Sequence, residues 1–259
     1  MKQYFCKDPT RDFKLEVARG RIEDFEHFHL MSYNDDVGSS EEFISPVGDL
    51  TIPTSKVTTV DIYSSSTDDD GDPTSNTGAQ TIVINYLDDD FAEQTKTITM
   101  NGTSKVEWTS ADFYRFQSAY VATSGTGNTN AGNIEITDAG NTLKYGYIDA
   151  GDGCSQCGIY TVPAGKTLYL KSLNANGAVY DDSVDIILYS EATHHTSHVK
   201  LENQWMYLAG LSVKGTSSRL NLDYYKIPEK TTIYMTGNAT TGGEVVYVGL
   251  VGKLVSNVD

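Results

Sequence analysis

Two cysteines three positions apart are the first residues in this sequence whose spacing suggests chemistry. Cys154 and Cys157 form a C-x-x-C pair, which would supply half of a four-ligand structural zinc site. The remaining ligands would come from His194, His195 and His198, which lie together in a polar stretch. No strand–helix–strand pattern surrounds the cysteines, so a thioredoxin-like redox role is not indicated. We therefore interpret them as loop thiols beside a strand, leave open whether they are paired, and predict no metal there.

Runs of aspartate suggest a second kind of site. Asp68, Asp70 and Asp72 place hard oxygen ligands at alternate positions, a spacing that suits Ca²⁺. The run lacks the glutamate at the twelfth position that completes an EF-hand loop. A second run of aspartates, at positions 88–90, has the same limitation. We interpret both runs as exposed acidic turns, with Asp68, Asp70 and Asp72 as the calcium candidates.

The histidines also raise the question of a metal-dependent jelly-roll enzyme, which would use His194 and His198. Enzymes of that kind carry a His-x-His pair and a downstream Glu on strands, whereas these histidines follow a turn-like Ser-Glu-Ala-Thr at 190–193. The sequence contains no G-x-S-x-G nucleophile elbow, no P-loop and no paired-carboxylate motif. We therefore predict no catalytic residue and no cofactor, and interpret the histidines as a solvated loop.

Composition and periodicity predict the elements that would hold these residues. Only 21% of the 259 residues are charged, and the 17 tyrosines favour strands. From Lys56 onward, strand-length apolar segments bounded by Gly, Asn, Asp and Pro recur about every 10–12 residues. Asn101-Gly102 is a signal for a tight hairpin. Residues 243–255 are apolar on both faces, which predicts a central or partner-covered strand. We predict an all-β protein with an antiparallel sandwich, jelly-roll-like, over 51–259, as one body or as two subdomains split near 151–153.

Charge is distributed unevenly along the chain. The formal net charge is −16, yet residues 1–30 carry six bases and six acids, while residues 31–93 carry one base and fourteen acids. No basic run is present, which argues against a nucleic-acid partner. No apolar stretch of about 18 residues is present, which argues against a membrane-spanning helix. The first eight residues lack an apolar segment, so we expect no secretory signal and synthesis in a cytoplasm.

Several short motifs, in the same order along the chain, resemble virion structural proteins of tailed bacteriophages. The N-terminal arm of that family resembles residues 13–20 and 31–42, and its later blocks resemble residues 62–69, 77–81, 87–103 and 159–167. The resemblance implies a β-sandwich of the virion without a catalytic site.

From this resemblance and the neutral N-terminal region we expect residues 1–50 to form an attachment arm. The apolar residues that would contact the partner are Phe13, Leu15, Val17, Ile22, Phe25 and Phe28. The implied role is a capsid decoration or cement protein that bridges major capsid subunits, forms homo-oligomers and is located in the virion. A tail, collar or fibre-adaptor role is one alternative. A carbohydrate-binding sandwich is another, because Trp108, Trp205 and the tyrosines could stack on sugars.

Overall fold

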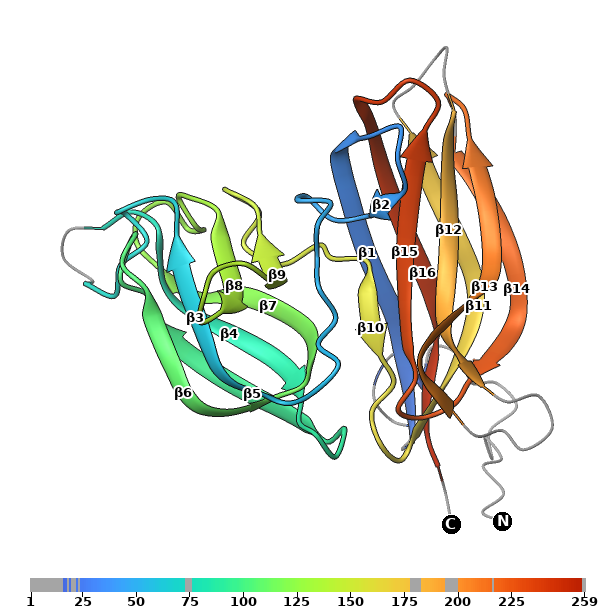
Figure 1. Ribbon diagram of the computed structural model, residues 1–259, viewed down its shortest axis with the longest axis horizontal. Coiled ribbons are helices and arrows are strands. Elements are labelled where there is room, and N and C mark those ends of the chain that lie inside the picture. The colour runs from blue at the N-terminus through green and yellow to red at the C-terminus, as the bar shows by residue number, and fades with distance from the viewer. Residues whose placement is uncertain are drawn as a thin grey trace.

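The computed structural model of the chain shows an all-β protein whose strands gather into two units (Figure 1). It describes residues 16–17, 19, 22, 24–72, 76–177, 183–193, 200–215 and 217–257. The strands are β1 Phe25–Val37, β2 Glu42–Phe43, β3 Val57–Ser64, β4 Ala79–Leu87, β5 Glu93–Thr99, β6 Val106–Phe113, β7 Arg115–Ser124, β8 Ile134–Asp138, β9 Lys144–Ile148, β10 Ile159–Thr161, β11 Lys166–Gly177, β12 Val184–Thr193, β13 Lys200–Val213, β14 Ser217–Ile227, β15 Thr232–Ala239 and β16 Glu244–Ser256.

These strands form four antiparallel sheets. Strands β3–β9 make up an inserted unit, with sheet orders β6-β3-β8-β9 and β5-β4-β7. The remaining strands make up a main unit, with sheet orders β1-β16-β11-β14 and β10-β15-β12-β13, and β2 pairs with β15. The prediction of an all-β antiparallel protein is confirmed. No helix long and apolar enough to span a membrane occurs among the residues that the structure describes.

Each unit has its own hydrophobic core, to which both of its sheets contribute. In the main unit, Leu250 on β16 and Ile186 on β12 belong to one cluster, and both side chains are fully buried. In the inserted unit, Ile84 on β4 and Ile136 on β8 belong to a second cluster, and both side chains are fully buried. Alternation along each strand directs one set of side chains to the core and the other to the surface. Residues 151–153 lie in the connection from β9 to β10, where the chain leaves the inserted unit for the main unit.

Strand β1 places much of the expected N-terminal arm inside the main unit. Its residues 25–37 pair with β16, and the ring of Phe28 is buried in the core 4.7 Å from that of Tyr160, centroid to centroid. Residues 25–37 are therefore an edge strand of the β body, and the expectation of a separate arm over 1–50 is wrong for them. Their alternation of buried Phe28 with exposed His27 and His29 has the strand period of two.

Two further local predictions can be compared with the pairing. Strand β16 lies between β1 and β11, as its two apolar faces predicted. The Asn101-Gly102 turn forms, and Gly102 has a φ of +58°, but it joins β5 to β6, which belong to different sheets. The hairpin prediction is therefore wrong, because the dipeptide determines a local turn while strand pairing is decided by longer-range packing.

Candidate functional site

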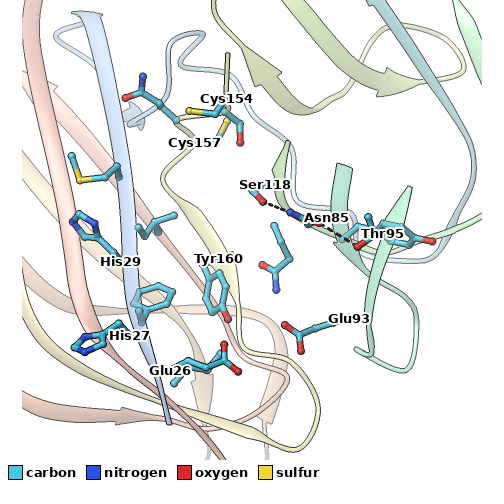
Figure 2. A pocket seen from close by; sticks show the side chains of 18 of the residues that line it. Glu26, His27, His29, Asn85, Glu93, Thr95, Ser118, Cys154, Cys157 and Tyr160 are labelled. Atoms are coloured by element: carbon cyan, nitrogen blue, oxygen red, sulfur yellow. Dashed lines mark hydrogen bonds between the residues drawn. The ribbon is translucent and has the colours of Figure 1, made fainter. Parts of the chain in front are cut away.

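A cleft of about 740 Å³ lies between the two units (Figure 2). One wall is β1, and the other is the outer face of the β5-β4-β7 sheet. On that outer face the Asn85 amide donates to Ser118 Oγ at 2.9 Å, and Thr95 Oγ1 donates to Asn85 Oδ1 at 3.3 Å. The remaining lining includes Glu26, Glu93, Cys154, Cys157 and Tyr160.

A buried charged network joins the two units. The guanidinium of Arg115, at the start of β7, lies 3.8 Å from the Glu191 carboxylate on β12, and both side chains are at most 2% exposed. Arg115 also donates to Thr232 Oγ1 at 3.3 Å and to the carbonyl of Pro53, and its guanidinium lies 3.8 Å from the centre of the Tyr114 ring. The amide of Thr232 donates to Glu191 at 2.8 Å. The pair and its hydrogen bonds are made only while the two units are in contact, and removing one partner would leave the other charge buried and uncompensated.

Two further polar contacts cross the same interface. The side-chain amide of Gln117 on β7 donates to the Thr161 carbonyl at 2.6 Å and accepts from the Thr161 amide at 3.0 Å, so it acts as a backbone partner for β10. The ammonium of Lys166 lies 2.8 Å from Glu93 and 3.1 Å from Glu26. Desolvation lowers the pKa of Lys166, but the hydrogen bonds and charges of the two carboxylates outweigh it and the pKa is raised.

The C-x-x-C cysteines lie in the cleft as free thiols (Figure 2). Burial raises the pKa of Cys157 to about 12, despite a contact with the Tyr147 carbonyl at 3.7 Å. Burial and the charge of Asp152 raise the pKa of Cys154. Both shifts disfavour the thiolate, which is the form that attacks electrophiles and binds metals.

The acidic run of residues 68–72 has a structural centre that the sequence reasoning missed. Asp69 is fully buried, and its carboxylate accepts bonds from Ser64 Oγ at 2.5 Å and from the amides of Ala79, Ala131 and Gly132 at 2.6–2.8 Å. The calcium candidates Asp68, Asp70 and Asp72 surround it in sequence. Among their contacts, the Asp72 amide donates to Asp70 Oδ1 at 3.0 Å and Thr77 donates to Asp68 at 3.3 Å. Within the described residues, no group of three or more His, Cys, Asp or Glu side chains could hold a metal ion.

The residues expected to form the attachment arm have different positions. Val17 and Phe28 are buried, and Ile22 and Phe25 are half-buried. Phe13 and Leu15 lie outside the described residues, as do His194, His195 and His198. Because Val17 and Phe28 are buried, their side chains pack within this chain and are not exposed to a partner.

An aromatic cluster covers the outer face of the β10-β15-β12-β13 sheet. Tyr234 on β15 lies at its centre, and its ring centroid is 4.7 Å from Trp205, 5.1 Å from Tyr189 and 5.1 Å from Phe43. Trp205 is 36% exposed, and Tyr207 on the same strand is 61% exposed. Trp and Tyr are enriched at the centres of protein interfaces, so this face has the composition of a contact surface. Trp108, the other tryptophan, is instead buried in the inserted unit.

No protein-family model matches the sequence, and no curated protein does so either. Among solved structures, the chain is similar to infectious bursal disease virus of the Gt strain, with 11% identity and a TM-score of 0.24, covering 90% of this chain and 73% of that one. The Gx strain of the same virus gives 9% identity and a TM-score of 0.18, covering 90% and 81%. Likeness at these TM-scores carries no argument about the fold or function of this chain.

Proposed function

We propose that this chain is a non-enzymatic structural protein of a tailed-phage virion, and specifically a capsid decoration or cement protein that bridges major capsid subunits. The observation that carries the proposal is the buried Arg115–Glu191 contact between the units. Enzymes that work in clefts between domains commonly open and close about a hinge. A bridging protein instead needs its contact surfaces at a fixed spacing, and a buried charged pair across the interface provides that rigidity.

The sheet arrangement and the sequence motifs support the same role. Each unit has two sheets around one core, from which we infer a sandwich in each, with the jelly-roll order as our finer proposal. The motif blocks from residue 31 onward that resemble phage virion proteins lie in both units and in β1. We assign attachment to the N-terminal residues that precede β1, which include Phe13 and Leu15.

The direct test is localisation on the particle. Virions purified from the source of the chain are labelled with gold-conjugated antibody raised against the purified protein and imaged by electron microscopy. Regularly spaced label on the shell is the expected result. Label confined to the tail or collar would replace decoration with the tail, collar or fibre-adaptor role, and virions without label would overturn the proposal.

A truncation tests the attachment segment. The truncation should end before β1, because removing residues 25–37 would take an edge strand from the main unit. A variant lacking residues 1–15 should keep its β-sheet circular dichroism and lose binding to shells stripped of the protein. Undiminished binding by this variant would show that attachment uses another surface.

The exposed Trp205 and Tyr207 favour carbohydrate binding as a second candidate function. Titration calorimetry with a panel of neutral and acidic glycans, with and without EDTA, separates it from the first. Binding heat that disappears with EDTA would also support Asp68, Asp70 and Asp72 as calcium ligands. A panel without binding heat would remove this candidate and leave the virion role unaffected.

A further inference from the structure

The outer face of the β1-β16-β11-β14 sheet is basic, although the chain as a whole is strongly acidic. Its side chains lie opposite the core, because their neighbours along each strand, such as Leu250 and Leu254, are buried. Cross-strand pairing aligns these outward side chains in four rows, each with one residue from β1, β16, β11 and β14 in that order. The rows are His27, Lys253, Tyr169 and Lys226; His29, Val251, Ser172 and Asn221; Met31, Gly249, Asn174 and Arg219; and Tyr33, Tyr247, Asn176 and Ser217. These rows contain three Lys or Arg side chains and no Asp or Glu. Two carboxylates border them, because exposed Asp223 accepts from the Asn221 amide at 2.6 Å and Asp149 accepts from the Tyr33 hydroxyl at 2.5 Å. We call this surface the basic face.

The basic face also has a groove and exposed apolar groups. A groove of about 500 Å³ runs over it, lined by Met31, Arg219, Tyr247 and Gly249 among others. Met31 is 46% exposed, and Tyr247 is 49% exposed and stacks on Tyr33 at 5.6 Å. Within the part of the chain that the structure describes, Arg219 has no ion-pair partner. A cation beside exposed apolar groups is the composition of a docking surface.

The opposite side of the main unit carries the complementary chemistry. A groove of about 610 Å³ begins at Phe43 and Tyr234 of the aromatic cluster, which also pack against the core of the inserted unit, and it extends to Thr142 of that unit. It is lined by Glu41, Glu42 and Asp49, with no Lys or Arg in its lining. Asp49 lies 3.6 Å from Lys144, while Glu41 and Glu42 have no ion-pair partner among the described residues. We call this groove, together with the aromatic cluster, the acidic face.

We propose that the basic face of one copy of this chain docks against the acidic face of a second copy. The two faces cover opposite sheets of one unit, so the contact joins different surfaces on the two copies and is head-to-tail. In the bound pair, Arg219 would lie over exposed aromatic rings and within reach of carboxylates, where cation–π attraction and charge act together. The proposal deepens the proposed function, because a virion protein is present in many copies.

Charge reversal on each face gives a specific test. Sedimentation velocity from about 1 to about 100 µM protein measures self-association. Arg219→Glu should weaken the dissociation constant of the pair at least about tenfold, and so should Glu41→Lys. Lys56→Glu and Asp89→Lys are the matched controls, because they change the charge equally at an exposed pair of the inserted unit. Since Glu41 also accepts a bond from Thr236, Tyr207→Ser is a second variant on the acidic face.

Mixing the two face variants distinguishes this geometry from other associations. Arg219→Glu protein retains its acidic face and Glu41→Lys protein retains its basic face, so the mixture should form a 1:1 pair that does not grow. Raising salt from about 0.05 to about 0.5 M should weaken that pair, because screening shortens the range of the charges. The docking is overturned if the wild type is monomeric at every concentration, if the mixture stays monomeric, or if the controls match the face variants. Regular label on virions combined with a monomeric wild type would reject the docking and retain the virion role.

Discussion

Replacing Arg115 with alanine tests whether the two units are held together by their buried polar contact. The substitution removes the bonds to Thr232 and Pro53 and leaves the Glu191 carboxylate in a site where that side chain is 1% exposed. Removing one partner of a buried pair costs about 3–5 kcal/mol, because the remaining charge has lost its compensation. For a chain of this size that corresponds to a fall in melting temperature of roughly 6–20 °C.

The assay can follow each unit separately, because each contains one of the two tryptophans. Trp108 is buried in the inserted unit and Trp205 lies on β13 of the main unit. Single-tryptophan variants unfolded in urea should report one shared transition in the wild-type background. In the Arg115→Ala background the two transitions should move apart, since each unit keeps its own core after the connection is weakened.

The exposed pair of Lys56 and Asp89 is the control for the Arg115 result. Their nitrogen–oxygen distance is 3.2 Å, and the side chains are 42% and 52% exposed. Exposed pairs contribute about 0–1 kcal/mol, so Lys56→Ala should change the free energy of unfolding by no more than that. The reasoning is refuted if Arg115→Ala also stays within about 1 kcal/mol of the wild type. The double variant Arg115→Met with Glu191→Leu should recover part of the loss, because no buried charge remains.

Three further predictions concern single side chains. Asp69→Asn should lower the free energy of unfolding by about 2–4 kcal/mol, because a buried acceptor of four hydrogen bonds loses its charge. Urea titration measures this change, and an unchanged midpoint of the unfolding transition would contradict the prediction. Burial, with a hydrogen bond and charge from Glu135, raises the pKa of Tyr63 to about 12, so Glu135→Gln should lower it in ultraviolet titration. Because this folded-state pKa lies above the ordinary value of 10.0, the contribution of Tyr63 to stability is complete below pH 10 and is lost as pH rises toward 12. Iodoacetamide at neutral pH should alkylate exposed Cys154 slowly, and it should alkylate buried Cys157 only in urea. Mass spectrometry measures the labelling, and rapid labelling of both cysteines in the native protein would disprove the raised pKa values.

Local patterns in the sequence were sufficient for the class of the fold and for many of its strands. The alternation along residues 93–99 and the apolar run at 81–87 predict strands, which pair as β4 and β5 across the turn at 88–90. The apolar faces of residues 243–255 predict the central position of β16. These features follow from a period of two and from turn residues, which act over a few positions and can be read directly.

Pairing and burial over long distances could not be read in this way. The alternation of residues 25–37 is consistent with either an arm or an edge strand, and only contact with β16 decides between them. Arg115 sits among aromatic residues in the sequence, and this is a faint signal of burial, but its partner Glu191 is 76 positions away along the printed sequence.

The sequence by itself determined an antiparallel β protein with a strongly acidic chain and a neutral N-terminal region. Only the tertiary structure showed which charged side chains share a face of the main unit. Arg219 and Lys226 lie on β14 and Lys253 lies on β16, and they share a face because the register of β11 with these two strands aligns them. Strand register is set by which side chains must enter the core, so the composition of the outer face follows from packing on the inner one.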